Sequence, residues 1–457
     1  MLLEQITNAG IVGCGGAGFP TAAKYNTKAE YFIINAAECE PLLKTDHYVM
    51  NHYAEECIQA ITAVGKLLEA EHLVIATKGH YTKEINALEK AIQKYNAPIS
   101  IFKMNNFYPA GDEQIMVFEV TGRTVPPGGI PIEVGCVISN ISTMLNVFHA
   151  QQGKNVTHKL LTITGAVNEP KILEVPIGTS FEDCLALAGG ATIDDFLFIN
   201  GGPMMGKTGT KEDFSHQVVT KTTSGIIIME KRDFIYELLE KEIPQMINKA
   251  RSSCIQCRLC TELCPRYQIG HPIHPHRVMR HLTITEIPED IDDDPIWKEA
   301  LLCCECGICE TIACPMELLP RQVNKYVKQR LAEKGIRYQK TEQPLSPSIM
   351  REFQQVSPVK ILLKDGLKQY VDLTVEELAK YETNRVTIPL KMHIGAPCEP
   401  TVQVGDQVKV GEMIGRKPEK ALGAAIHASI DGTVTAIDTG ITIESLMVIS
   451  QDRNLKK

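Results

Sequence analysis

Two runs of cysteines constrain the fold of this chain more than any other feature. The first run has the spacing C-x2-C-x2-C-x3-C before a proline, and the second has C-x2-C-x2-C-x4-C before a proline. Their members are Cys254, Cys257, Cys260 and Cys264, then Cys303, Cys306, Cys309 and Cys314. Such paired runs are typical of a domain that wraps two [4Fe-4S] clusters, in which three thiolates come from one loop and the fourth comes from the other run.

This crossing predicts two ligand sets. One cluster is expected on Cys254, Cys257, Cys260 and Cys314, and the other on Cys303, Cys306, Cys309 and Cys264. A further thiol, Cys304, lies beside Cys303, so the choice between these two ligands stays open. Structural zinc is an alternative, although it usually takes two CxxC pairs. A disulfide framework is typical of short secreted chains instead.

Composition limits the other classes of function. A chain of 457 residues with 44% apolar and 22% charged residues can form three or four globular domains. Its net charge of -8 gives no general attraction for nucleic acid. The cysteines outside the two runs are scattered singly, as in a reducing compartment. We also find no signal-peptide pattern and no apolar run long enough for a bilayer. We expect a cytoplasmic protein with no nucleic-acid partner and no direct membrane insertion.

The first 155 residues are expected to form an α/β domain. Apolar stretches at Tyr31–Asn35 and Leu73–Thr77 predict buried parallel strands, and the apolar spacing over Glu55–Ala70 predicts a helix. A glycine-rich turn, Gly13–Thr21, precedes them. Such a turn can present backbone N–H groups to a phosphate, although a glycine-rich turn is more often a turn and nothing else.

Three more stretches sharpen this interpretation. They are Asn35–Pro41 (NAAECEP), Tyr108–Glu113 (YPAGDE) and Asn140–Thr143 (NIST). With the glycine-rich turn, they resemble the flavin-binding subunit of respiratory complex I and its relatives, the RnfC proteins and the PduS-type cobalamin reductases. In that family these segments enclose FMN, and NADH stacks on its ring. The resemblance implies a Rossmann-like FMN- and NADH-binding domain.

The resemblance also implies roles for single residues. The implied cofactor-binding residues are Gly13, Gly15, Gly16, Phe19, Lys24, Asn35, Glu38, Glu40, Gly111, Asp112, Glu113, Asn140 and Thr143. Phe19 would stack on the dinucleotide, and Glu40 would accept hydrogen bonds from its ribose. Glu40 favours NADH over NADPH, because a 2′-phosphate would meet a like charge. Ala37 replaces an acid of the complex I pattern, so one flavin contact is lost or replaced.

The remaining chain predicts three further modules, and the expected fold is multidomain α/β and α+β. The predicted domains are 1–155 for FMN and NADH, 156–233 as an SLBB β-grasp domain, 234–337 as a helical ferredoxin-like two-cluster domain, 338–384 as a linker, and 385–457 as an all-β barrel-sandwich hybrid. The SLBB and barrel-sandwich modules are identified by resemblance to the same family. Short strands separated by glycine turns support the last one.

Four histidines lie between or beside the cysteine runs. They are His271, His274, His276 and His281. The prolines among them favour a structural role, with Pro275 starting a helix that places charge near a cluster. Direct ligation of a metal or a corrin is the alternative.

Flavin and clusters together predict an electron-transfer enzyme. A flavin accepts two electrons from NADH and releases them singly, and iron–sulfur centres carry single electrons onward. We predict no acid–base or nucleophilic catalytic residue. Because the barrel-sandwich module comes last, as in PduS-type proteins, the resemblance implies an NADH-dependent cobalamin reductase. Its acceptor would be cobalamin or an adenosyltransferase, and a bacterial microcompartment with its shell protein is an expected location and partner.

Two alternatives remain at this point. One is an RnfC-like subunit that delivers electrons to a partner protein or a membrane complex. The other is a non-catalytic iron–sulfur scaffold, for which Ala37 is the only support. The final acceptor, the cluster potentials and the oligomeric state are left open by the sequence.

Overall fold

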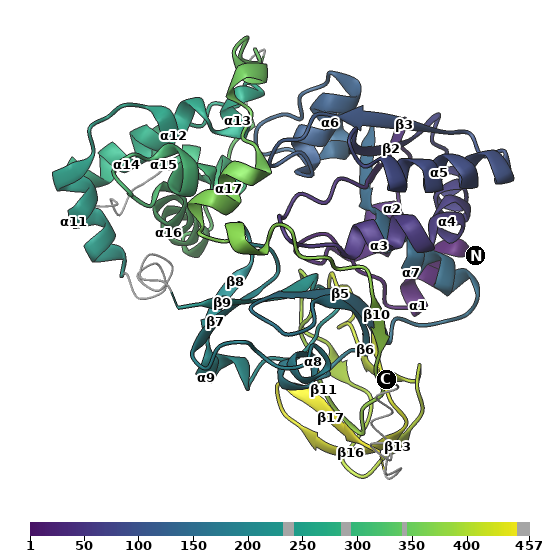
Figure 1. The fold of residues 1–457 in the computed structure, drawn as a ribbon. Coiled ribbons are helices and arrows are strands. Elements are labelled where there is room, and N and C mark those ends of the chain that lie inside the picture. The colour runs from purple at the N-terminus through teal and green to yellow at the C-terminus, as the bar shows by residue number, and fades with distance from the viewer. Residues whose placement is uncertain (232–241, 285–293, 341–344, 446–457) are drawn as a thin grey trace.

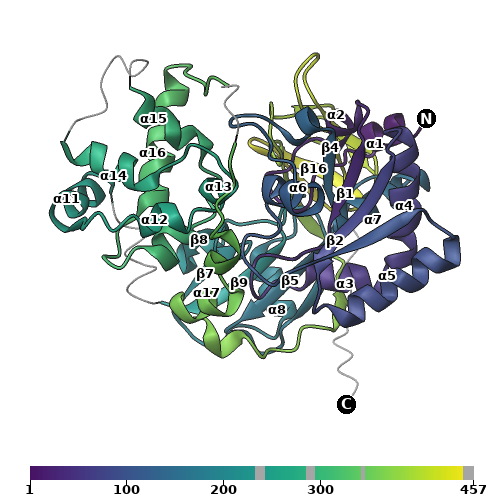
Figure 2. The ribbon, with the colours of Figure 1, turned by 90° about the horizontal axis from the view of Figure 1, so that it is seen from above.

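The computed structural model describes residues 1–231, 242–284, 294–340 and 345–445. Figure 1 shows a first α/β module and a helical module on opposite sides, with a mixed β module between them and a small β module below. Figure 2 shows the same arrangement from above. The expected multidomain α/β and α+β fold is confirmed. The predicted boundary at residues 233 and 234 lies outside the described residues.

The first module contains a four-stranded parallel sheet of order β3-β2-β1-β4. Its strands are β1 (Tyr31–Asn35), β2 (His72–Lys78), β3 (Ile99–Met104) and β4 (Cys136–Asn140). Its helices are α1 (Leu2–Asn8), α2 (Thr21–Tyr25), α3 (Thr45–His52), α4 (Ala54–Leu67), α5 (Thr82–Tyr95), α6 (Glu113–Thr121), the 3-10 turn η1 (Pro131–Val134) and α7 (Ile141–Gln151). The two predicted strands and the predicted helix are confirmed.

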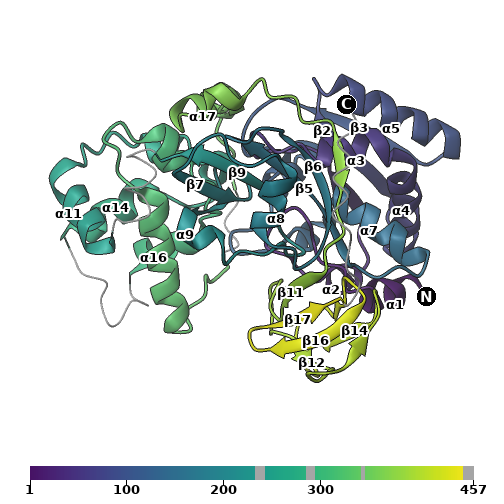
Figure 3. The same ribbon diagram turned by 60° about the horizontal axis from the view of Figure 1, so that its bottom comes forward.

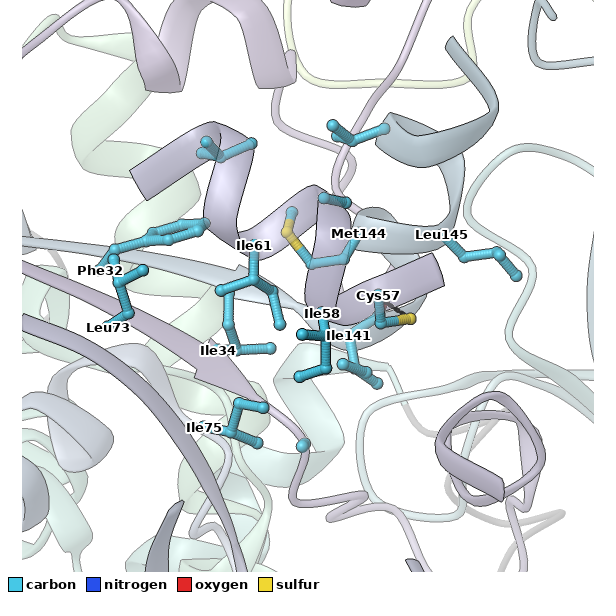
Figure 4. Close-up of a cluster of buried hydrophobic side chains, with 14 of the residues drawn as sticks. Phe32, Ile34, Cys57, Ile58, Ile61, Leu73, Ile75, Ile141, Met144 and Leu145 are labelled. Carbon is cyan, nitrogen blue, oxygen red and sulfur yellow. Dashed lines mark hydrogen bonds between the residues drawn. The ribbon is translucent and has the colours of Figure 1, made fainter. Parts of the chain in front are cut away.

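Helix α4 packs on this sheet because its apolar residues recur every three or four positions. Ile58 and Ile61 are fully buried, and Figure 4 shows them facing Ile34 of β1 and Ile75 of β2. Met144 of α7 joins the same cluster. Burying one such side chain stabilises the fold by roughly 1.5–3 kcal/mol. The sheet that carries the candidate site is therefore rigidly supported from this face.

The second module is a six-stranded sheet of order β10-β6-β5-β9-β7-β8. Its elements are β5 (His158–Gly165), β6 (Lys171–Pro176), α8 (Phe181–Leu187), β7 (Phe196–Asn200), β8 (Lys207–Thr210), α9 (Lys211–Phe214) and β9 (Gly225–Glu230). Ser180 caps α8 by accepting a hydrogen bond from the backbone N–H of Asp183. Phe181, Phe198 and Phe214 pack edge to face in the core.

The edge strand of this sheet comes from the segment that composition predicts to be a linker. Residues 345–384 contain η4 (Arg351–Gln354), α17 (Pro358–Lys364), η5 (Lys368–Tyr370) and β10 (Leu378–Lys380). Strand β10 pairs in parallel with β6, and Leu362, Leu367 and Tyr370 are buried in the core of the second module. This segment is therefore part of the fold of the second module.

The cysteine-rich module is helical. Its elements are α11 (Ile243–Ser253), α12 (Leu259–Glu262), α13 (Pro265–Gln268), α14 (Pro275–Ile284), α15 (Pro295–Glu299), η2 (Ala300–Leu302), the π-helical turn η3 (Cys309–Ala313) and α16 (Pro320–Glu333). Trp297, Val327 and Leu331 are fully buried at its centre. Both prolines that follow the cysteine runs lie where a new turn begins, and Pro265 occupies the first position of α13.

The C-terminal module is all β and lies beside α1 and α2, as Figure 3 shows. Its strands are β11 (Arg385–Pro389), β12 (Glu399–Pro400), β13 (Gln407–Val408), β14 (Met413–Arg416), β15 (Ile426–His427), β16 (Gly432–Ile437) and β17 (Gly440–Glu444). They form two small sheets around a core that includes Ile388, Ile414 and Ile441.

Among the described residues, we find no helix with the length and apolar character needed to cross a membrane.

Candidate functional site

The carboxyl ends of β1 and β4 form a switch point in the first sheet. From β1 the chain builds β2 and β3 on one side and then returns to β4 on the other. The two strands end at Asn35 and Asn140, which are paired in register. Open parallel sheets bind ligands in the crevice at such a point. Two residues predicted to contact flavin therefore lie together where a cofactor is expected.

The glycine-rich turn lies against this switch point. A Cβ atom at Gly15 would come within 2.9 Å of the side-chain nitrogen of Asn140, which favours glycine here. The backbone N–H of Cys14 donates to the hydroxyl of Thr143 at 3.0 Å. Gly16 is exposed, and a Cβ atom there would meet no atom within 4 Å. An open backbone held in this place fits the phosphate of a flavin.

Phe19 and Lys24 flank the turn. The N–H of Gly13 donates to the carbonyl of Phe19 at 2.9 Å and closes the turn. The ring of Phe19 is 39% exposed, so one of its faces is accessible to a stacking partner. Lys24 forms an ion pair with Glu113 in the first turn of α6. The structure thus brings two predicted residues together and satisfies the charge of Lys24 within the protein.

Gly111 closes the other side of the switch point. Its carbonyl accepts a hydrogen bond from the Asn35 amide at 2.9 Å, and its N–H donates to the sulfur of Cys39 at 2.6 Å. A Cβ atom at Gly111 would lie 3.0 Å from that sulfur. Asp112 caps α6 and also pairs with Arg266 at 2.8 Å. The loop after β3 therefore joins the flavin site to the cysteine-rich module.

Acidic side chains gather below the glycine-rich turn. Asp46 accepts hydrogen bonds from the Asn140 amide at 2.7 Å and from the Ser142 hydroxyl at 2.6 Å. Burial raises the pKa of Glu38, and the negative charges of Asp46 and Glu40 raise it further. A protonated Glu38 would be a hydrogen-bond donor, which fits the acceptor atoms of a flavin ring.

Glu40 points into the second module. Its two carboxylate oxygens accept hydrogen bonds from the backbone N–H groups of Met204 and Met205, at 2.9 and 3.1 Å. Burial raises the pKa of Glu40 to about 7, although these hydrogen bonds and the charge of Arg321 lower it. In this conformation the predicted ribose acceptor binds the loop between β7 and β8.

The first predicted cluster set surrounds a pocket, which we call the outer site. The pocket is lined by Cys254, Cys257, Cys260 and Cys314, together with apolar neighbours such as Ile255 and Met316. Burial raises the pKa of the Cys260 thiol to about 12, and the thiols of Cys314, Cys257 and Cys254 add to this effect. A bound cluster would reverse the shift, because coordinating thiols are deprotonated.

The second predicted set gathers closer to the flavin site, and we call it the inner site. It consists of Cys264, Cys303, Cys306 and Cys309. Burial raises the pKa of Cys309, and after Glu310 the next contributors are Cys303 and Cys264. Among the described residues, no three His, Cys, Asp or Glu side chains converge tightly enough for a single metal ion. The four thiols of each site fit the wider spacing of a four-iron cluster better than zinc.

The backbone gives both cysteine loops the same shape. In the first loop, Gln256 and Arg258 have positive φ angles of 56° and 67°, on either side of Cys257. In the second, Glu305 and Gly307 have φ angles of 60° and 84°, on either side of Cys306. This equivalence aligns Cys303 with Cys254. We therefore propose that Cys303 is the ligand and that Cys304 is the additional thiol.

The four histidines have separate partners. His271 bonds the carbonyl of Val125 at 2.8 Å, and His276 bonds the hydroxyl of Thr261 at 2.7 Å. His274 pairs with Glu299 at 3.0 Å, and His281 pairs with Asp294. Burial lowers the pKa of His271 and of His276 to about 4. These contacts favour the structural role over direct ligation.

Several buried polar residues at the site are absent from the sequence-based set. Asp46 holds Asn140, Arg266 holds Asp112, and the hydroxyl of Tyr108 donates to the carbonyl of Cys306 at 2.9 Å. The partners in these pairs are 94 to 198 residues apart in the chain. No local pattern indicates such contacts. The only sequence signal for Tyr108 is its place next to the Gly111–Glu113 turn.

Comparison with protein families matches every module. The chain matches the Nuo51 FMN-binding domain over residues 6–149, the SLBB domain over 160–208, the 4Fe-4S dicluster domain over 253–319 and the RnfC barrel sandwich hybrid domain over 369–451. The last match begins within the segment that composition predicts to be a linker.

Curated relatives extend over nearly the whole chain. The chain is 40% identical to the cobalamin reductase PduS of Citrobacter freundii, over 98% of this chain and 96% of the relative. It is also 40% identical to the PduS protein of Salmonella typhimurium, over 96% and 95%. The RnfC-like component of the Na+-translocating ferredoxin:NAD+ oxidoreductase complex of Acetobacterium woodii is 33% identical over 57% of each chain.

Among solved structures, an NAD+-reducing [NiFe]-hydrogenase in the H2-reduced state covers 76% of this chain and 69% of its own. The two chains share 18% sequence identity and a TM-score of 0.48.

Proposed function

Because this chain belongs to the family of the cobalamin reductase PduS and is a flavin and iron–sulfur oxidoreductase, we propose that it passes electrons from NADH to cobalamin. The proposal rests on the 40% identity to PduS proteins, which extends over nearly the whole chain. Bound FMN would supply the change from two-electron to one-electron transfer, and two [4Fe-4S] clusters would supply single-electron carriers.

The residues around the switch point would bind and orient the flavin. The turn at Gly15 and Gly16 would hold its phosphate, and Asn35 and Asn140 would fix its position at the ends of β1 and β4. The closed contact between Gly111 and Cys39 would keep water away on the side that faces the clusters. Phe19 would stack on the nicotinamide dinucleotide.

Anaerobic reconstitution with iron, sulfide and FMN tests this function. NADH should bleach the flavin absorbance and then produce the EPR signals of reduced clusters, and added hydroxocobalamin should give the spectrum of cob(II)alamin. NADH oxidation without corrin reduction would contradict cobalamin as the acceptor. Flavin that stays oxidised with NADH would contradict the donor.

A second candidate is an electron-transfer protein that delivers electrons to a partner protein or a membrane complex. The observation that favours it is the 33% identity to the component of the Acetobacterium woodii complex. This match covers 57% of the chain, whereas the PduS match covers 98%. Co-purification of reduced protein with a membrane fraction, together with failure to reduce cobalamin, would support it.

Location and partners are further parts of the proposal. We propose a cytoplasmic protein that works inside a bacterial microcompartment, with an adenosyltransferase and a shell protein as partners. The relationship to PduS supports this placement. Density-gradient fractionation of the native cells should place the protein with the compartments. Its presence only in the free cytoplasmic fraction would contradict that location.

A further inference from the structure

We propose that the two clusters act in a fixed order, in which the inner site receives electrons from the flavin and the outer site releases them to the acceptor. This order rests on the proposed function and deepens it. It assigns each set of cysteines a position in the electron path. The contacts of each set with the rest of the chain support the assignment.

The inner site touches the flavin-binding module directly. Tyr108, which is 2% exposed, donates its hydroxyl to the carbonyl of Cys306 at 2.9 Å. Cys39 packs in the same buried cluster as Tyr108 and Cys306, and it accepts the hydrogen bond from the N–H of Gly111. Gly111 in turn is bonded to Asn35 at the switch point. A continuous chain of packed and hydrogen-bonded atoms therefore leads from the flavin site to the inner site.

An ion pair fixes this contact from a second side. Arg266 lies two residues after Cys264 and pairs with Asp112 at 2.8 Å. Both side chains are largely buried, with exposed fractions of 11% and 15%. Asp112 also caps α6, so the pair joins the flavin loop to the start of α13. The short path between the flavin site and the inner site is thus held rigidly.

The outer site lies on the opposite side of the cysteine-rich module. In Figure 1, α13 lies toward the flavin module, whereas α11, which ends next to Cys254, lies on the far side. Cys257 is exposed. Its apolar neighbours Ile255 and Leu259 are 61% and 42% exposed. A cluster in this loop would lie at the surface, where an acceptor in solution can approach it.

Two short turns connect the sites. Helix α12 (Leu259–Glu262) links Cys260 of the outer site to Cys264 of the inner site. The turn η3 (Cys309–Ala313) links Cys309 of the inner site to Cys314 of the outer site. The two turns pack against each other. The chain therefore brings the two sites together, and each site lies one turn from the other.

The electrons balance along this path. NADH gives a hydride, which carries two electrons, to the flavin. The electrons then pass one at a time through the inner site and the outer site, and each reduces one acceptor. The net products are NAD+, one proton released to water and two acceptors reduced by one electron each.

The test compares Cys257→Ala with Cys306→Ala in the reconstituted full-length protein. Dithionite and EPR first establish that each variant keeps one cluster. The flavin is then reduced by light and EDTA, which avoids NADH. In Cys257→Ala we expect the remaining cluster to become reduced while acceptor reduction is lost. In Cys306→Ala we expect a reduced flavin beside a cluster that stays oxidised.

The opposite pattern would overturn the order. A Cys306→Ala protein whose remaining cluster fills as fast as in the unmodified protein would do so, as would a Cys257→Ala protein whose remaining cluster no longer accepts electrons. If the flavin responds to light but not to NADH and the cluster order holds, the proposed donor is wrong and the order stands.

A second variant decides the matter if either alanine variant loses both clusters. Tyr108→Phe keeps all eight cysteines and removes the hydroxyl that bonds Cys306. We expect slower reoxidation of the flavin by the clusters in stopped-flow absorbance, with unchanged reduction of the flavin. Tyr326→Phe is the matched control, because Tyr326 packs in the core of the cysteine-rich module that includes Cys254 and Cys314. Equal rates in the two variants would overturn the order.

Discussion

At the scale of single residues, Gly16 offers the most direct test of the flavin site. It is exposed, its φ angle is not in the left-handed region, and a Cβ atom there would contact nothing in the protein. Glycine at this position therefore has no steric reason within the chain itself. A ligand that lies over the backbone would supply one.

We expect Gly16→Val to weaken FMN binding while it leaves the apoprotein stable. The side chain would fill the space above the turn where the phosphate is proposed to lie. Equilibrium dialysis or flavin fluorescence measures the affinity, and thermal unfolding of the apoprotein is the control. Unchanged FMN affinity would place the flavin elsewhere.

Glu40 predicts a pH dependence of stability. Burial raises its pKa to about 7 in the folded protein, from an ordinary value of 4.5. The folded state therefore holds a proton that the unfolded state has lost, and its stability falls as the pH rises from 4.5 to 7. Glu40→Gln removes this titration. In urea unfolding, the unmodified protein should lose stability relative to the variant between about pH 5 and 7.5, whereas a constant difference would contradict the prediction.

Sequence reasoning identifies the residues whose neighbours in the chain carry the signal. The residues predicted around Gly15, Asn35 and Asn140 do meet at one switch point. Asp46 escapes it because the partners Asn140 and Ser142 follow more than ninety residues later. A buried carboxylate whose partners lie far along the chain leaves no local pattern to detect.

At the scale of elements, the N-terminus of α6 carries two functions in one side chain. Asp112 accepts hydrogen bonds from the N–H groups of Gln114 and Ile115, and its second oxygen pairs with Arg266. The cap stabilises the helix that follows the flavin loop. The ion pair links that helix to the cysteine-rich module.

Two substitutions at Asp112 should separate these functions. Asp112→Asn keeps the cap and removes the charge, and we expect a loss of about 1–3 kcal/mol because the Arg266 guanidinium remains largely buried. Asp112→Ala also removes the cap, which should cost about 1 kcal/mol more. Glu69→Gln, which removes one charge of the exposed pair with Lys28, is the control and should cost less than about 1 kcal/mol. Equal costs for all three in urea unfolding would contradict this assignment.

The elements also show where sequence patterns end. Strand β1 is predicted at its observed bounds because five consecutive positions are apolar or strand-forming. Strand β10 has only three residues and ends in Lys380. Its pairing is decided by the free edge of β6, about two hundred residues earlier in the chain. A short strand of this kind has no periodicity from which it could be predicted.

At the scale of the whole molecule, Lys221 joins three modules. It lies in the second module with 2% exposure and donates to the carbonyls of Gly10 and Ala425, both at 2.6 Å. Gly10 begins the segment that leads into the glycine-rich turn, and Ala425 belongs to the C-terminal module. Burial lowers the pKa of Lys221 to about 8.

We expect Lys221→Met to destabilise the protein by about 1–3 kcal/mol at about pH 7.5, because two buried carbonyls lose their donor. The unfolded chain binds more protons than the folded one between pH 8 and 10.5, so the unmodified protein should gain stability relative to the variant as the pH rises through this range. Thermal unfolding measures both effects. Lys391→Met, at an exposed lysine of the C-terminal module, is the control. A difference that does not change with pH would contradict the buried charge.

The exchange of Cys264 and Cys314 between the two sites has a consequence for how the protein is made. On the proposed ligand sets, a nascent chain that ends before residue 303 holds only three ligands for the outer site and one for the inner site. Neither cluster can be completed until synthesis has passed residue 314. Maturation must then follow translation of the whole module, and a cell short of iron would accumulate protein in which both clusters are missing together.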